Sequence, residues 1–312
     1  MKKLLIVLFT LIVIGCQKKT IDVDWVIQSS GSANTLNCIV FPKPSTGYIV
    51  GAGGTILKTI NGGTRWTSQV SGTTNTLNSV YFSNADTGYA VGAGGTILRT
   101  TNGGNQWTNQ VSGSTNELFS VYFTDVNIGY AVGYYGTVLK TINGGAQWMV
   151  QPSGTTNWLW SVFFTDANTG YAVGDSGKII KTADGGVHWT AQPSGTIKSL
   201  YSVSFPKANT GYASGSGGIV LKTINGGIDW TIQASGIAND LFSVYFTYEN
   251  TGYAVSWPGT ILKTVNGGSE WTKQVANTSN GLRSVVFTDS YTGYVVGVKG
   301  TIIKTTNGGG SY

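Results

Sequence analysis

The sequence predicts an all-β fold: a seven-bladed β-propeller of four-stranded, 41-residue repeats, closed by a strand from the N-terminal end. A Gly-Tyr pair recurs at one spacing, since Gly88-Tyr89 follows Gly47-Tyr48 by 41 residues (88 − 47). The remaining pairs begin at Gly129, Gly170, Gly211, Gly252 and Gly293. A constant period without insertions indicates one supersecondary unit copied seven times.

Each unit contains four short segments rich in Val, Ile, Tyr, Phe and Thr. In the second unit they cover residues 77–82, 88–92 and 95–100 and the stretch that follows Trp107. Gly, Asn, Asp or Ser bounds each segment, which is typical of strands and turns. No stretch after residue 16 shows the 3.6-residue apolar period of a helix. Four strands in about 40 residues is the pattern of a propeller blade.

The tryptophans predict how the ring closes. A Trp opens the fourth strand of six units, at Trp66, Trp107, Trp148, Trp189, Trp230 and Trp271. The seventh unit stops at Tyr312, where its fourth strand would begin, whereas Trp25-Val-Ile-Gln28 matches a fourth strand. We therefore expect the segment from Trp25 to complete the last blade and to protect its edge.

The turn before each Trp resembles the Asp-box of BNR-repeat proteins. It reads Thr59-Ile-Asn61-Gly-Gly63-Thr-Arg-Trp66 in the first unit and recurs with Asn or Asp in the same place. Such a residue bonds nearby backbone, and Gly allows positive φ. Together with Gly-Tyr-Ala-Val-Gly, this turn is most similar to the photosystem II stability/assembly factor family, over residues 25–312.

That resemblance implies extracytoplasmic assembly or binding work without catalysis. It also implies an Arg-rich binding surface in the photosynthetic members. Here the arginines are Arg65, Arg99 and Arg283, in different slots of different units. The resemblance therefore indicates the family, whereas these arginines do not favour a photosystem as the partner.

The N-terminal end predicts export and lipidation. Lys2 and Lys3 precede an apolar run from Leu4 to Ile14, as in a secretory signal, and Gly15-Cys16 resembles a bacterial lipobox. We expect residues 1–15 to be a lipoprotein signal peptide, residues 16–24 to be the lipidated Cys16 with a tether, and residues 25–312 to be the propeller. The expected location is extracytoplasmic, on the bacterial envelope, with the outer membrane favoured in a Gram-negative cell because Gln17 follows the cysteine.

Other recurring positions are interpreted as structural. Cys38 stands where the other units have Ser, so we expect a buried small side chain without a disulfide. Seven of the cations that give the net charge of +6 share one slot before the turn, as Lys58 does. A cation in this slot of every blade, Arg99 in the second and lysine in the other six, favours a structural, snorkelling role over a cationic ring for an anionic partner.

Departures from the repeat predict the binding site. The slot after the first Leu of each unit varies, as Asn37, Asn78, Phe119, Trp160, Tyr201, Phe242 and Arg283. Aromatic residues also replace the usual small ones at Tyr134, Tyr135, Trp158 and Trp257. All map to one rim, which we call the top rim, where the loops between second and third strands meet the connections between blades. Polar Glu117, Asp175, Lys198 and Asp240 accompany them. We predict partner binding by Phe119, Tyr134, Tyr135, Trp158, Trp160, Tyr201, Phe242, Trp257 and Arg283; the alternative is that they plug the channel.

Catalytic and metal chemistry is poorly supported. Gly174-Asp175-Ser176-Gly177 resembles a serine nucleophile string, but the single histidine, His188, belongs to the opposite rim. One His and no clustered Cys argue against a metal site, and no phosphate loop is present. Asp175 and Asp240 are the best candidates for paired carboxylates.

We therefore expect a non-catalytic, lipid-anchored binding or assembly scaffold, monomeric and without cofactor or metal. Its partner would be a protein or carbohydrate of the cell envelope, not a nucleic acid. The alternatives are a photosystem II assembly factor proper and a sialidase-like glycoside hydrolase.

Overall fold

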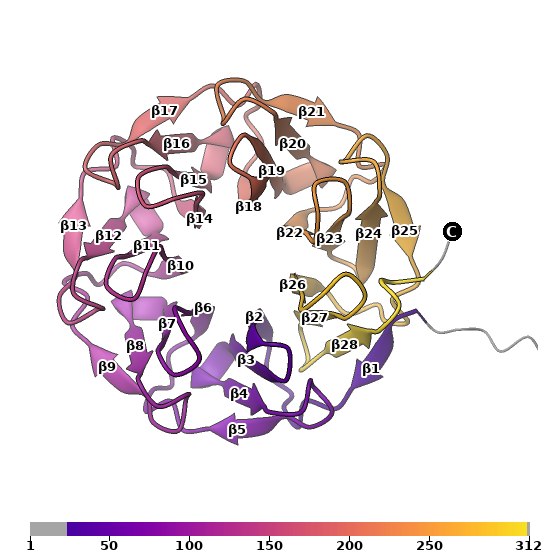
Figure 1. Cartoon of the computed structure of the whole chain (residues 1–312), viewed down its shortest axis with the longest axis horizontal. Coiled ribbons are helices and arrows are strands. Elements are labelled where there is room, and N and C mark those ends of the chain that lie inside the picture. The colour runs from indigo at the N-terminus through magenta and orange to yellow at the C-terminus, as the bar shows by residue number, and fades with distance from the viewer. Residues whose placement is uncertain (1–23, 311–312) are drawn as a thin grey trace, which may run out of the picture.

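The computed structural model describes residues 24–310 and confirms the seven-bladed propeller. Seven four-stranded antiparallel sheets stand around a central axis, with the first strand of each nearest the axis (Figure 1). The predicted signal peptide, Cys16 and Tyr312 lie outside the described residues. Within residues 24–310 no helix has the length and apolar character needed to cross a membrane.

The strands fall into four concentric sets, one member per blade. The innermost strands are β2 (Leu36–Lys43), β6 (Leu77–Phe82), β10 (Leu118–Phe123), β14 (Leu159–Phe164), β18 (Leu200–Lys207), β22 (Leu241–Phe246) and β26 (Leu282–Phe287). The second strands are β3 (Thr46–Gly51), β7 (Gly88–Gly92), β11 (Gly129–Gly133), β15 (Gly170–Gly174), β19 (Thr210–Gly215), β23 (Gly252–Ser256) and β27 (Gly293–Gly297).

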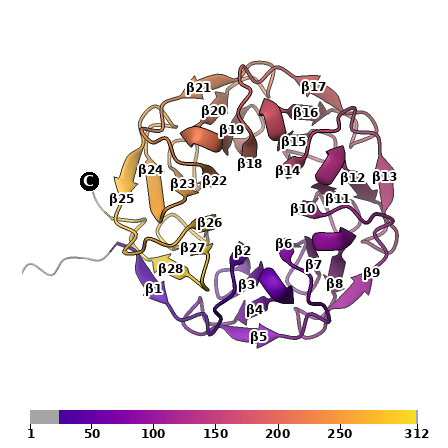
Figure 2. The same ribbon diagram turned by 180° about the vertical axis from the view of Figure 1, so that it is seen from behind.

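The third strands are β4 (Ile56–Thr59), β8 (Ile97–Thr100), β12 (Val138–Thr141), β16 (Ile179–Thr182), β20 (Val220–Thr223), β24 (Thr260–Thr264) and β28 (Ile302–Thr305). The outermost strands are β5 (Thr67–Gln69), β9 (Thr108–Gln110), β13 (Met149–Gln151), β17 (Thr190–Gln192), β21 (Thr231–Gln233), β25 (Thr272–Gln274) and β1 (Val26–Gln28). Short 3-10 turns join second to third strands in five blades, at η1 (Ala52–Gly54), η2 (Ala93–Gly95), η3 (Tyr134–Gly136), η4 (Asp175–Gly177) and η5 (Ser216–Gly218). These turns lie on the face nearer the viewer in Figure 2, which is the top rim.

The predicted closure is confirmed. Strand β1 pairs with β28 in the sheet β1-β28-β27-β26, with Ile27 opposite Ile303. Trp25 is fully buried and packs edge-on against Phe287, with ring centroids 6.0 Å apart. Phe82 and Trp107 make the same contact in an ordinary blade. Trp25 therefore fills the seventh Trp position, and the two ends of the described chain meet in one blade (Figure 1).

The Gly-Tyr pair has a packing explanation. A Cβ on Gly88 would lie 2.5 Å from the Phe82 ring, so glycine leaves room for that phenylalanine. Tyr89 is fully buried and stacks on Phe123 of the next blade at 3.9 Å between centroids. Its hydroxyl donates to the carbonyl of Gly144, in the next Asp-box, at 2.8 Å. The pair thus joins one blade to the next.

The recurring lysine reinforces this inter-blade latch, as the structural interpretation predicts. Lys140 Nζ donates to the Gly185 carbonyl at 2.6 Å, and Tyr130 Oη donates to the same oxygen at 2.7 Å. Equivalent lysine contacts are Lys58 to Gly103, Lys181 to Gly226, Lys222 to Gly267 and Lys304 to Gly62. These lysines therefore help to hold neighbouring blades of the propeller together.

The Ser slot also joins blades. The Val121 N–H donates to the Ser79 hydroxyl at 3.3 Å, and the same bond recurs between later blades. Cys38 occupies this slot as a free, partly buried thiol whose Sγ lies 3.9 Å from the Val80 carbonyl oxygen. Burial raises the pKa of the Cys38 thiol. A small polar side chain is what this position requires.

Candidate partner-binding site

The variable slot forms a pocket at the top end of the propeller axis. In every blade the first strand has a β-bulge between its Leu and its Ser or Cys, as between Leu77 and Ser79. A bulged residue is released from the ladder, and its side chain is turned aside. Seven such side chains enclose about 310 Å³, and we call this cavity the axial pocket: it is lined by Asn37, Asn78, Phe119, Trp160, Tyr201, Phe242 and Arg283.

Most of the predicted site residues are in mutual contact. Trp160 stacks on Phe119 at 4.1 Å and meets Tyr201 edge-on at 5.8 Å between centroids. Tyr201 stacks on Phe242 at 5.4 Å, and the Arg283 guanidinium lies 4.5 Å from the Phe242 centroid. The rings of blades three to six thus form a continuous run that ends on a cation from blade seven.

A second branch leads outward from the pocket along the top rim. Tyr134 packs edge-on against Phe119 at 4.8 Å and lies 4.2 Å from the Trp158 ring. Tyr135 is two-thirds exposed, and its ring centroid lies 6.1 Å from that of Tyr134, at the exposed end of this branch. We call Phe119, Tyr134, Tyr135, Trp158, Trp160, Tyr201 and Phe242 the aromatic face.

Acidic side chains hold the aromatic face in position. Trp160 Nε1 donates to Asp175 Oδ1 at 2.7 Å. The Tyr201 hydroxyl donates to Asp240 Oδ2 at 3.5 Å, and the backbone N–H of Gly217 donates to Asp240 Oδ1 at 2.8 Å. Partial burial, and then the neighbouring Glu117 carboxylate, raise the pKa of Tyr134. The carboxylates that could have served as catalytic acids are therefore engaged with this surface.

Trp257 stands apart from the aromatic face. It follows β23 in blade six, is about half exposed (49%), and makes no contact with another ring in the described chain. A Cβ on Gly281 would lie 1.9 Å from the Trp257 ring, so the indole lies against the connection between blades six and seven. Trp257 shares the rim but not the cluster.

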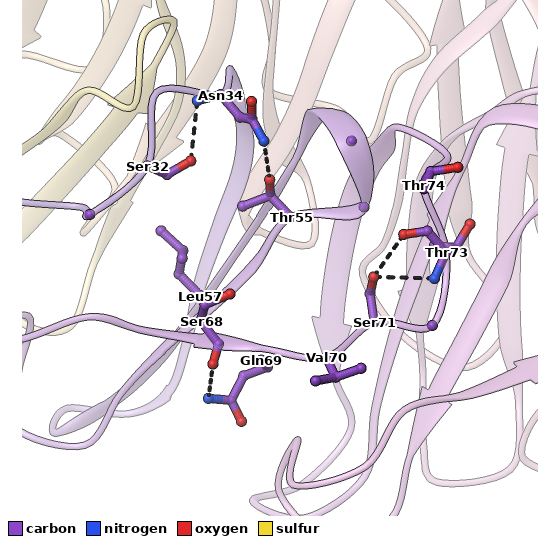
Figure 3. Close-up of a pocket in the computed structure, with 14 residues that line it drawn as sticks. Ser32, Asn34, Thr55, Leu57, Ser68, Gln69, Val70, Ser71, Thr73 and Thr74 are labelled. Atoms are coloured by element: carbon purple, nitrogen blue, oxygen red, sulfur yellow. Dashed lines mark hydrogen bonds between the residues drawn. The ribbon is translucent and has the colours of Figure 1, made fainter.

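A cavity larger than the axial pocket is part of the repeat and not of this site. It encloses about 800 Å³ at the outside of blade one and is lined by polar side chains and glycines, including Asn34, Gly53 and Ser71 (Figure 3). The next cavity, of about 740 Å³, uses Asn75, Gly94 and Ser112, each 41 positions further along (75 − 34). A hollow that recurs with the period of the fold belongs to the architecture.

The serine-nucleophile resemblance is explained by local structure. Asp175–Gly177 is the 3-10 turn η4, equivalent to the same turn in four other blades. His188 is highly exposed and lies between β16 and β17, with Nδ1 2.6 Å from Asp184 Oδ2. Ser176 lies between β15 and β16, at the other end of β16. Among residues 24–310 no group of three His, Cys, Asp or Glu side chains is arranged for a metal ion.

The sequence prediction omitted Asn37 and Asn78 from the site. Both line the axial pocket, and Asn78 Nδ2 donates to Glu117 Oε1 at 2.8 Å. Their position in the variable slot was the available signal. A criterion based on aromatic residues alone excludes a polar side chain that occupies the same slot of another blade.

The fold and the site define the class as an Asp-box seven-bladed propeller with an aromatic, repeat-breaking top rim. The family model described as photosynthesis system II assembly factor YCF48 matches residues 17–114, 150–235 and 194–279. These segments cover more than half of the chain, which therefore belongs to that family. No curated protein matches the chain.

Solved structures share the fold. YCF48 from Cyanidioschyzon merolae is 21% identical, with a TM-score of 0.77, and the match covers 90% of this chain and 98% of that one. A structure of YCF48 bound to D1 peptide is 17% identical, with a TM-score of 0.78 and coverage of 91% and 95%. The GH74 enzyme of Niastella koreensis is 16% identical, with a TM-score of 0.78 and coverage of 92% and 54%. At these identities the likeness establishes the fold alone.

Proposed function

We propose that the protein is a non-catalytic binding or assembly scaffold that holds a protein segment on its aromatic face. The observation that carries the proposal is that the departures from the repeat gather on one surface, where ring contacts join them. Rigid aromatic side chains supply large contact area at low entropic cost, which is typical of recognition surfaces. Family membership agrees with a protein partner, and one YCF48 structure contains a peptide.

The proposal includes an anchor at the bacterial envelope. Its basis is the signal-like run from Leu4 to Ile14 and the lipobox-like Gly15-Cys16. Asp24 accepts a hydrogen bond from Asn307 Nδ2, so the chain enters the propeller at the Asp-box rim. A tether attached there would leave the aromatic face free for a partner. We expect the Cys16→Ser variant to be exported but no longer to fractionate with the membrane. Unchanged membrane fractionation would contradict the anchor.

Capture experiments test the binding role. The parent protein is expected to retain a partner from envelope extract that Trp160→Ala loses, because Trp160 contacts three other rings of the face. Ile142→Ala is the matched control, since Ile142 is exposed on the Asp-box rim of blade three. Equal capture by Trp160→Ala and the parent would place the binding site elsewhere.

Glycoside hydrolysis is the competing function. It would use Asp175 and Asp240, whose bonds to Trp160 and Gly217 favour a supporting role. Turnover of a glycan that disappears in Asp175→Asn would favour the enzyme. A photosystem II assembly role proper predicts a photosynthetic host and a photosystem subunit as the captured protein.

A further inference from the structure

The axial pocket has two chemically different halves. Blades three to six contribute four aromatic rings, whereas blades seven, one and two contribute Arg283, Asn37 and Asn78. The slot before this position is Leu and the slot after it is Ser or Cys in every blade. Between these two constant slots the side chain that faces the cavity varies, and this variation separates aromatic from polar residues around the axis.

Arg283 is a partly buried cation that forms no ion pair with the residues that the structure describes. Its guanidinium lies against Phe242, and its Nε is buried with no hydrogen-bond partner among residues 24–310. The two ion pairs found in that part of the chain are His188–Asp184 and Lys207–Glu249, neither of which involves it. Burial lowers the pKa of Arg283, yet a guanidinium keeps its proton in proteins. A desolvated charge is costly unless an opposite charge meets it.

The neighbouring amides leave that charge unsatisfied. Asn37 Nδ2 donates to the Leu77 carbonyl at 3.0 Å, and Asn78 Nδ2 donates to the Leu118 carbonyl at 3.0 Å and to Glu117 Oε1. The carboxylate of Glu117, on the top rim, is thus hydrogen-bonded to Asn78. A ligand that reaches the pocket would meet one free cation and an aromatic wall.

We propose that the axial pocket binds a carboxylate carried by a flat apolar group of about one aromatic ring. The carboxylate accepts hydrogen bonds from the Arg283 guanidinium, whose planar fork matches two carboxylate oxygens. The apolar group lies against Trp160 and Tyr201. The volume of about 310 Å³ is at the lower end of the range for small-molecule sites, which fits a single ring with a short acid.

Two sources carry this chemistry: a free aromatic acid, or the C-terminal residue of a peptide. The inference does not depend on the proposed scaffold role, because a free acid would bind whether or not a protein partner exists. Tyr135 belongs to the aromatic face but does not line the pocket. Tyr135→Ala therefore probes the scaffold role separately.

Calorimetric titration of the purified chain with 3-phenylpropionate and with 3-phenylpropionamide tests the pocket. The acid is expected to bind at one site, and the neutral amide about tenfold or more weakly, since a hydrogen bond to a charged group is lost. Arg283→Gln should weaken the acid to the level of the amide, while Arg65→Gln, on the opposite rim, leaves it unchanged. Arg283→Lys keeps the charge but lacks the planar guanidinium, so its affinity for the acid should be intermediate.

The outcomes are distinguishable. Equal affinity for acid and amide, or full affinity in an Arg283→Gln protein with the parent melting temperature, would overturn the proposal. A tripeptide ending in Phe, with a free or an amidated C-terminus, forms the second arm. Binding of the free tripeptide but not of the small acid assigns the site to a chain end; failure of both acids would also overturn it.

Discussion

The two rims of the propeller use the same residue types for different purposes. At the Asp-box rim, Trp107 is buried, packs edge-on against Phe82, and is repeated around the ring. At the top rim, Trp160 is half-buried, contacts the rings of Phe119 and Tyr201 in a slot that holds Asn or Arg in three other blades, and donates a hydrogen bond to Asp175. Tryptophan therefore builds the blade in one place and a surface in the other. The internal repeat distinguishes these two roles, because a residue that the fold requires is present in every blade.

The cations show the same contrast. Lys140 donates to a carbonyl of the next blade and so helps to close the ring, as its counterparts do. Arg283 lines the axial pocket and bonds to no carboxylate in the described chain. A cation in a repeated slot is held by the frame, and a cation in the variable slot is available to a ligand.

The largest effect is expected from removing the closure. Deletion of residues 21–30 removes β1 and the buried Trp25, and it exposes the edge of β28. We expect an aggregating or strongly destabilised protein, because an open sheet edge and a missing core side chain act together. Size-exclusion chromatography and thermal unfolding measure this. Removal of residues 17–20 is the control, and a normal monomer without residues 21–30 would refute the closure.

Two tryptophan substitutions sharpen the comparison between rims. Trp107→Ala should lower the free energy of unfolding by about 3–5 kcal/mol, as expected for a buried aromatic side chain. Trp160→Ala should lower it by less, because the Trp160 ring is only half-buried, and should abolish partner binding. Denaturant unfolding measures both. Similar losses would mean that Trp160 is packing between blades and not part of a site.

The tyrosine latch should have a smaller effect. Tyr171→Phe removes the hydroxyl that donates to the Gly226 carbonyl at 2.7 Å, while Lys181 still donates to that oxygen. We expect a loss of about 1 kcal/mol in the free energy of unfolding. Combining it with Lys181→Met should cost more than the sum of the two single variants, because the carbonyl then has neither donor. Strict additivity would show that the two donors act independently.

Alkaline pH should open the same latch. Burial raises the pKa of Tyr48, Tyr130, Tyr171, Tyr212 and Tyr294 to about 12. A raised pKa in the folded state means that the stabilisation is complete below the ordinary tyrosine pKa of about 10 and is lost as the pH rises towards 12. We expect unfolding in that interval, with the loss of β-sheet circular dichroism accompanying the ionisation of these five buried tyrosines, which NMR of ring-labelled tyrosine distinguishes from the exposed ones. Ionisation of the five at pH 10 in a folded ring would contradict this.

The smallest effect is expected at His188. Hydrogen bonds from the His188 backbone and ring lower the pKa of the exposed Asp184 carboxyl. A lowered pKa stabilises the fold only above the ordinary aspartate value, and this contribution is lost as the pH falls. His188→Asn should raise the pKa of Asp184 in an NMR titration without changing the melting temperature at pH 7. A marked fall in that temperature would give this pair a role in the frame.

The fold can be predicted from the sequence because the residues shared by all seven units show what each blade requires. The period, the Gly-Tyr pair and the unmatched Trp25 together imply seven blades and the closing strand, and all are confirmed. The bulge could not be foreseen, since no residue type marks its position, which holds Asn in Leu77-Asn-Ser79 and Trp in Leu159-Trp-Ser161. The seven variable side chains therefore appeared as one feature of a rim and not as the wall of a pocket. Trp257 was grouped with the cluster because loop position alone does not reveal the direction of a ring.

Site-specific photo-crosslinking in cells of the source organism tests the central claim most directly. A photoreactive phenylalanine replaces Tyr135 on the aromatic face in one strain and Ile142 on the Asp-box rim in another. Both positions are exposed and belong to blade three. The account predicts a discrete protein adduct at position 135 that is absent at position 142 and is lost when Trp160→Ala is added. An adduct at 142 alone, or the same adduct at both positions, would contradict it.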